Sequence, residues 1–183
     1  YAGTHGTFPY AAPDSSAPYA GTFGVLLNDS GYLRHAAVLN CPCDKRDRVP
    51  DRLPDFRTLC LDESRAPKSS PCLRNVDYAY NLGYRQDGRP VPISIAAPIS
   101  TPLLADRPPC TKNHCKVLDG NSPNHGGLGQ NVLYTGGHVR WHPTRRLGPH
   151  DDDMFLNAEH HLAPGLHEQD AVLGPGFARF DAR

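Results

Sequence analysis

The side chains best suited to chemistry in this sequence are six cysteines, which lie in three neighbouring pairs: Cys41 and Cys43, Cys60 and Cys72, Cys110 and Cys115. Only 38% of the residues are hydrophobic, and 17 Gly and 19 Pro favour turns over long elements, so we expect a thin core. Disulfides supply stability that a thin core lacks, and they persist in oxidising compartments. The cysteines therefore predict a disulfide-stapled domain in an export compartment.

The sequence leaves the pairing of these cysteines open. Local bridges within the second and third pairs are the simplest arrangement, whereas a bridge between Cys41 and Cys43 would be strained, which favours a different partner for each. The alternative is a soft-metal cluster of cysteines with His114. That cluster lacks the paired Cys-x2-Cys spacing of zinc ribbons, and the sequence has no Cys-x-x-Cys-His motif for covalent haem.

Histidines offer a second kind of metal ligand, and seven of the ten lie in the last third of the sequence: His125, His138, His142, His150, His160, His161 and His167. Two of them, His138 and His142, would lie about 13 Å apart on one extended strand, at roughly 3.3 Å per residue. That separation is too large for one shared ion. We therefore expect surface or turn histidines here in preference to a shared zinc site.

An acidic run supplies the hard oxygen ligands that calcium prefers: Asp151, Asp152 and Asp153, beside His150. The run lacks the spacing of a known calcium loop, and adjacent aspartates commonly form a solvated turn. A calcium or zinc ion at this run is therefore kept as an alternative, and we expect no cofactor to be required.

A histidine followed by two glycines, at His125, Gly126 and Gly127, is the most distinctive local motif. A ring nitrogen at this position could bond the backbone of the following loop and fix its entry into a hairpin. The sequence has no Gly-x-Ser-x-Gly and no His-Glu-x-x-His pattern, so nothing accompanies His125 as a nucleophile or a metalloprotease site. We expect a structural role for this motif and no enzymatic activity.

A β-hairpin is the clearest secondary-structure signal. Residues 131–134 and 138–141 alternate between apolar and polar side chains on either side of Gly136 and Gly137, which can adopt the positive φ that a tight turn requires. Short helices are expected within residues 22–33 and 54–63, and strands within 76–84 and 101–105. These elements predict an α+β fold in which short helices pack on a small antiparallel sheet, joined by many loops.

Charge and hydropathy exclude two classes of partner. Lys plus Arg and Asp plus Glu number 19 each, so no net field draws the chain to nucleic acid. No apolar run approaches the roughly 20 residues that a membrane helix needs. Residues 1–18 are expected to form an extended arm, residues 19–142 the globular head, and residues 143–183 a polar C-terminal wrap of the same domain.

The stretch from His125 to Trp141 resembles the C-terminal signature of the bacterial prepilin-like (pseudopilin-like) proteins with an H-X9-DG motif, in the type IV pilin-like family. In that signature a His-Gly-Gly loop precedes a hairpin that ends in Asp-Gly; here Gly136 and Gly137 stand at the place of that pair, and ten residues separate His125 from Gly136. Shorter pieces agree in the same order, namely residues 5–9, 32–42, 77–84 and 103–106. The resemblance covers most of residues 1–142 and implies a pilin-like globular head.

That resemblance also implies a function. It predicts a structural subunit of an extracellular or periplasmic assembly at the bacterial cell surface, such as a pilus-like filament, a pseudopilus or a surface layer. Such a subunit acts by self-association, so its partners would be copies of itself or related pilin-like subunits. The alternative is a secreted module that binds a metal ion or a glycan through its C-terminal region, which is rich in His and Asp.

Overall fold

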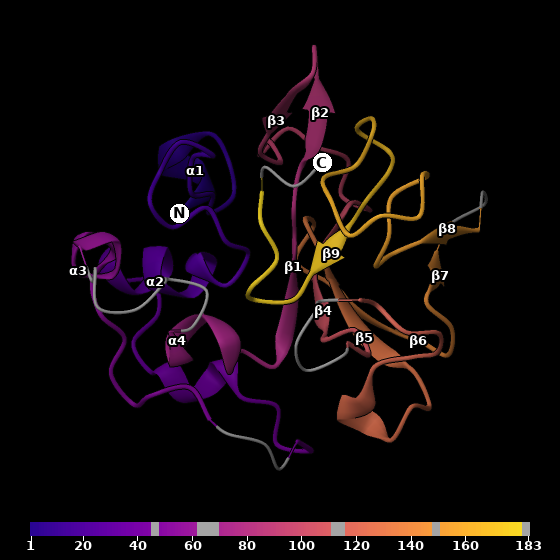
Figure 1. Cartoon of the computed structure of the whole chain (residues 1–183), viewed down its shortest axis with the longest axis horizontal. Coiled ribbons are helices and arrows are strands. Elements are labelled where there is room, and N and C mark those ends of the chain that lie inside the picture. Colours follow the sequence, from indigo (N-terminus) through magenta and orange to yellow (C-terminus); the bar gives the residue numbers. More distant parts are fainter. Residues whose placement is uncertain (45–47, 62–69, 111–115, 148–150, 181–183) are drawn as a thin grey trace.

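A five-stranded antiparallel sheet forms the centre of the computed structural model, which describes residues 1–44, 48–61, 70–110, 116–147 and 151–180 (Figure 1). The strand order is β6-β5-β4-β1-β9, and each neighbouring pair is antiparallel. The strands are β1 (Tyr78–Asn81), β4 (Pro102–Asp106), β5 (Gln130–Tyr134), β6 (Val139–His142) and β9 (Leu173–Gly174). The expected α+β class with a small antiparallel sheet is confirmed.

Short helices occupy one side of the molecule and small ribbons surround the sheet (Figure 1). The helices are α1 (Ala2–His5), α2 (Thr22–Asp29), α3 (Phe56–Leu61) and α4 (Pro71–Arg74), with 3-10 turns η1 (Ala36–Leu39) and η3 (Pro123–His125). The ribbons pair β2 (Tyr84–Gln86) with β3 (Arg89–Val91) and β7 (Arg146–Leu147) with β8 (Asp152–Asp153). None of the helices in the described ranges is long and apolar enough to span a bilayer.

The start of α3 shows why these short helices form where they do. Asp55 precedes the helix, and its Oδ1 accepts a hydrogen bond of 2.6 Å from the backbone N–H of Thr58. Asp29, at the end of α2, accepts a second bond of 2.7 Å from the N–H of Phe56. Two carboxylates thus satisfy amides that the first turn leaves without helical partners.

The predicted hairpin is confirmed by strands β5 and β6. Asn131 lies opposite Trp141 and Leu133 opposite Val139, and the connecting turn is closed by Gly137 N–H donating to Tyr134 O at 2.8 Å. Gly137 has a φ of 79°, a value that favours glycine. Burial alternates along β5 as the sequence predicts: Val132 and Tyr134 are buried, and Leu133 between them is only partly buried.

Both faces of the sheet carry apolar side chains, but different segments cover them. The buried side chains of one face (Ala79, Ala105, Val132, Tyr134 and Leu173) pack with Leu147, Met154 and Phe155 of the C-terminal segment. On the other face, Tyr80, Leu82 and Leu103 cluster with Phe23, Leu39 and Phe180. The Phe23 ring stacks on the Tyr80 ring at 4.6 Å between centroids, which joins α2 to β1.

The expected disulfide staples are not found among the described residues. Cys60 and Cys72 instead belong to an apolar cluster with Leu59 and Leu73, where Cys72 is 2% exposed and its Sγ lies 3.0 Å from Ser70 Oγ. Buried free cysteine behaves as a small apolar residue. Cys115 lies outside the described residues.

The two terminal segments contact the head closely. Residues 1–18 include α1, and Phe8 N–H donates to Ile93 O at 3.0 Å, while Ala11 and Ala17 are buried. The segment after residue 143 supplies β9, which pairs with β1, and the fully buried Phe155 and Phe180. Its interior face is therefore apolar, although its overall composition is polar.

Candidate functional site

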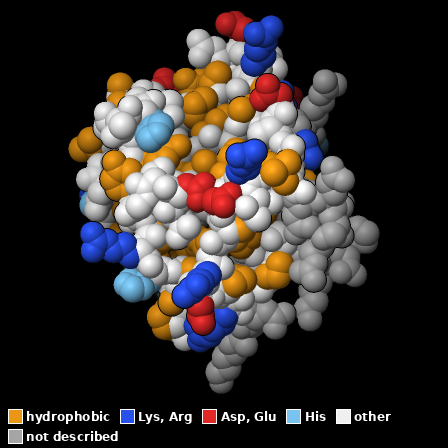
Figure 2. Space-filling view, turned by 90° about the vertical axis from the view of Figure 1, so that its left-hand side faces the viewer, with side chains coloured by type: hydrophobic (Ala, Val, Ile, Leu, Met, Phe, Trp, Pro, Cys, Tyr) orange, Lys and Arg blue, Asp and Glu red, His pale blue; other side chains and the backbone are white. Residues whose placement is uncertain are grey.

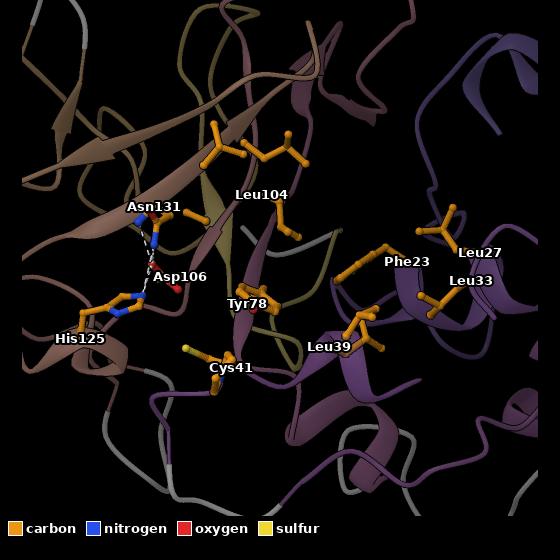
Figure 3. A pocket seen from close by; sticks show the side chains of 15 residues that line it. Phe23, Leu27, Leu33, Leu39, Cys41, Tyr78, Leu104, Asp106, His125 and Asn131 are labelled. Atoms are coloured by element: carbon orange, nitrogen blue, oxygen red, sulfur yellow. Dashed lines mark hydrogen bonds and ion pairs between the residues drawn. The ribbon is translucent and has the colours of Figure 1, made fainter. Parts of the chain in front are cut away.

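A mostly apolar groove of about 480 Å³ lies between α2 and the sheet. Figure 3 shows its two ends, with Phe23, Leu27 and Leu33 on the helical side and His125, Asp106 and Asn131 on the other. A second groove of about 410 Å³ shares Phe23, Leu27, Leu104 and Leu133 with the first and extends toward Tyr1 and Phe8. The two grooves together follow the sheet face that α2 covers only in part.

A row of apolar side chains crosses this sheet face from strand to strand, and we call it the apolar row: Tyr80, Leu104, Leu133 and Val139. Strand pairing makes them neighbours, since Leu104 lies opposite both Tyr80 and Leu133, and Leu133 lies opposite Val139. Tyr80 is 4% exposed beneath α2, Leu104 and Leu133 are partly buried, and Val139 is 60% exposed. Coverage of the sheet therefore declines toward its β6 edge.

Polar side chains form the opposite end of the groove, where Asp106 is the central acceptor. Its Oδ2 accepts bonds from Asn131 N–H at 2.6 Å and Asn131 Nδ2 at 3.2 Å, and its Oδ1 accepts a bond from Asn124 Nδ2 at 3.2 Å. Asp106 is only 2% exposed. A buried carboxylate requires such donors to offset its lost hydration. The bonds therefore fix β4 to β5 and to the η3 turn.

His125 binds to the same carboxylate. Its Nε2 lies 3.0 Å from Asp106 Oδ2, and its ring meets the edge of Trp141 at 5.5 Å between centroids. Asn131 Nδ2 lies 3.2 Å from the same nitrogen. In the tautomer that carries its proton on Nε2, the ring donates to the carboxylate, and the Nδ1 lone pair of a neutral ring is unused by the contact. The His125 ring therefore contacts a carboxylate of β4. The sequence predicts a different partner, the backbone of the loop that follows His125.

Two cysteines converge on His125 from a separate turn. Asp44 N–H donates to Cys41 O at 3.1 Å and closes a β-turn with Pro42 at its second position, a place that proline favours. One ligand atom each from Cys41, Cys43 and His125 lies within 4.8 Å of the others. Figure 3 shows the Cys41 sulfur pointing toward the side of the groove on which His125 lies. Cys41 is buried and Cys43 is exposed.

A shared hydrogen-bond network explains this convergence. Asp77 Oδ2 accepts a bond of 2.9 Å from Cys41 N–H, which attaches the cysteine turn to the residue before β1. Asn124 Nδ2 donates to Asp77 O at 2.7 Å, which attaches the histidine turn to the same residue. Asn124 is 2% exposed, so these bonds are shielded from water. Asp77 therefore holds both turns in a fixed relation.

Burial changes the acidity of groups around this end of the groove. It raises the pKa of the Cys41 thiol, an effect that the backbone amides of Cys43 and Asp44 oppose and that the Asp106 carboxylate reinforces. Burial also raises the pKa of Tyr78 to about 12, with smaller contributions from Cys41 and Asp106. Both shifts favour the neutral groups at pH 7, because an apolar surrounding penalises charge.

The acidic run near the C-terminus lies elsewhere. Asp153 forms an ion pair of 2.7 Å with Arg145, and burial beside Asp170 raises the pKa of Asp152, while Asp151 is exposed. Within the described ranges, these three aspartates do not form a group with ligand atoms close enough to share an ion. His150 and His114 lie outside the described residues.

The remaining residues of the predicted motifs lie in turns and in the β5–β6 hairpin. Gly126 and Gly127, with φ values of 68° and 78°, follow η3, and Gly136 and Gly137 form the hairpin turn. His138 stacks on Tyr134, and Tyr134 Oη lies 2.8 Å from His142 Nε2. Sequence reasoning missed Asp106 and Asp77, although each carboxylate adjoins an apolar strand. That position was the signal that could have identified them.

Comparison with known proteins gives no relative: the chain matches no protein-family model, no curated protein and no solved structure.

Proposed function

We propose that this protein is a structural subunit of an extracellular or periplasmic assembly, and that it acts by self-association through the groove and the exposed end of the apolar row. The assembly would be a pilus-like filament, a pseudopilus or a surface layer, as the resemblance of residues 125–141 to pilin-like proteins implies. A second copy of the chain, or a related subunit, would cover the sheet face that α2 leaves open.

The observation that carries the proposal is the decline in burial across the apolar row. Val139 and Leu133 continue a core that begins at Tyr80, yet Val139 is 60% exposed. Near the rim, Val38 is 59% exposed and Trp141 is 48% exposed. Contiguous exposed apolar side chains around a groove are typical of protein contact surfaces, whereas isolated ones are not.

The balanced charge of the chain favours association with another copy of the same protein. Lys plus Arg equals Asp plus Glu over the whole chain, and on the side of the molecule that Figure 2 presents, acidic and basic side chains are interspersed with hydrophobic ones. A surface without a dominant sign gives no electrostatic attraction to nucleic acid or anionic lipid. It also imposes no repulsion between identical copies.

The proposal is tested by sedimentation velocity over a wide range of protein concentrations, with Val139→Asp as the variant. Burying one valine side chain stabilises an interface by about 1.5 kcal/mol, which corresponds to roughly tenfold in the association constant. We expect the wild type to form oligomers as concentration rises and Val139→Asp to associate at least tenfold more weakly. A buried carboxylate would add to this loss.

Ile95→Asp is the matched control, since Ile95 is 52% exposed but does not line either groove. This control should associate as the wild type does. A wild-type chain that stays monomeric at every concentration would contradict the proposal. Equal weakening by both substitutions would also contradict it, because the effect would then come from added charge and not from the groove.

A further inference from the structure

We propose that Cys41, Cys43 and His125 form a binding site for one thiophilic metal ion, with zinc(II) as the best match. The inference is independent of the proposed function, because it concerns the polar end of the groove and not the apolar row. It also differs from both metal sites that the sequence suggested, which involved His114 or the acidic run.

The first argument is that ligand atoms from two separate segments of the chain lie close together. Ligand atoms of the three residues lie within 4.8 Å of one another, although the cysteines and the histidine are far apart in the sequence. Ligands bound to one zinc ion at about 2.0–2.3 Å are separated by distances of this order. In the described part of the chain, no other group of three His, Cys, Asp or Glu residues meets this condition.

The second argument is the orientation of the histidine. Asp106 Oδ2 lies 3.0 Å and Asn131 Nδ2 lies 3.2 Å from His125 Nε2. In the tautomer that carries its proton on Nε2 and donates it to Asp106, Nδ1 is the nitrogen that can donate a lone pair to an ion. Histidines that bind zinc commonly donate their other ring N–H to a carboxylate, which fixes the ring and makes it a better ligand. Asp106 is buried and is itself fixed by Asn131 and Asn124, so this support is rigid.

The third argument is the chemistry of the donor set. Two sulfur atoms and one imidazole select zinc(II) or another soft ion over calcium and magnesium, which prefer oxygen. Binding replaces two thiol protons, which leave to solvent, and adds a double positive charge to two thiolates. Three protein ligands leave one tetrahedral position for water or for a group from a partner. Because Cys43 is exposed, an ion can reach the site from solvent.

The test uses the full chain, purified with reductant and then titrated anaerobically with cobalt(II) and afterwards with zinc(II). We expect one cobalt ion per chain, with thiolate-to-cobalt charge-transfer absorption of the strength that two thiolates give, and loss of this signal when zinc displaces cobalt. Cys43→Ser should abolish the two-thiolate absorption without unfolding the protein, since its side chain is exposed. His125→Gln should keep the charge-transfer absorption but weaken zinc affinity at least tenfold.

Cys60→Ser is the matched control, because Cys60 is partly buried in a different cluster and should not alter the cobalt spectrum or the stoichiometry. Absence of stoichiometric binding would overturn the proposal. So would a cobalt spectrum that survives Cys43→Ser, or a disulfide between Cys41 and Cys43 in freshly isolated protein that has not been treated with reductant. Mass mapping of the alkylated, unreduced protein detects that disulfide directly.

Discussion

The Asp106 side chain contacts three residues of two segments, Asn124 and His125 of the η3 turn and Asn131 of β5, and so connects both segments to β4. His125 and Asn131 share its Oδ2, and Asn124 donates to Oδ1. Every one of these partners is a donor. A carboxylate with two accepting oxygens suits this position, and a side chain that carries its own donor does not.

Replacing Asp106 with asparagine should therefore destabilise the fold. Asn has one accepting oxygen, so its NH2 group would face at least one of the present donors and leave a buried polar group unsatisfied. We expect Asp106→Asn to lower the free energy of unfolding by about 1–3 kcal/mol, measured by urea denaturation. Asp119→Asn, at an exposed carboxylate, is the control and should change it little. Equal effects of the two substitutions would show that the buried network contributes nothing.

Among the elements, the β7–β8 ribbon contains a carboxyl group, Asp152, whose charge lowers the stability of the folded state. Burial, and then the nearby Asp170 carboxylate, raise the pKa of Asp152. A raised carboxyl pKa means that the folded state binds a proton more tightly than the unfolded state does. Asp152 therefore lowers stability once the pH exceeds its unfolded value near 3.8, and below that value the cost disappears.

Asp152→Asn should accordingly stabilise the protein at pH 7, and the gain should shrink as the pH falls toward 3. The asparagine oxygen can still accept the backbone bond from Ala171 that the carboxylate accepts. Thermal unfolding followed by circular dichroism between pH 3 and pH 7 measures this dependence. Glu168→Gln, at an exposed site in the same segment, should show no such trend. A stabilisation that is independent of pH would refute the electrostatic explanation.

Elements whose signals are local could be predicted from the sequence. The hairpin of β5 and β6 follows from alternation and glycines, and α2 and α3 lie within the two ranges where short helices are expected from the sequence. Strand β9 could not be predicted in this way. It has only two residues, Leu173 and Gly174, and their extended conformation depends on pairing with β1, a contact between distant segments.

The sequence alone can predict only part of the candidate metal site. The sequence singles out all three ligands, but it predicts that Cys41 and Cys43 form disulfides with different partners and that His125 bonds to its own loop. Their convergence depends on Asp77 and Asn124, which bond to each other between segments far apart in the chain. Spacing along the sequence carries no information about such a bond.

At the scale of the whole molecule, the segment after residue 143 is part of the core. Phe155 and Phe180 are fully buried, and Leu173 adds an edge strand. Losing one such phenylalanine costs about 3–5 kcal/mol, against a total stability of about 5–15 kcal/mol for ordinary domains. The fold should not survive the loss of both.

A chain that ends at residue 143 should therefore show no cooperative thermal transition and no near-ultraviolet circular dichroism signal. Phe180→Ala is the milder comparison, and it should still unfold cooperatively but at a lower temperature. Sharp, native-like unfolding of the shortened chain would mean that residues 144–183 are an accessory to an independent head, contrary to the packing described here.

The contact between residues 17–21 and residues 174–180 has a consequence for biosynthesis. Ala20 N–H donates to Ala178 O at 2.7 Å, Gly21 N–H to Gly176 O at 2.8 Å, and Phe180 N–H to Pro18 O at 2.9 Å. A β-carbon on Gly176 would collide with Leu73 O, so these segments meet in a space that admits little else. While the ribosome is still translating, the backbone groups of residues 18–21 lack these partners. The native state can be completed only after residue 180 has emerged, and until then the nascent chain needs protection from aggregation.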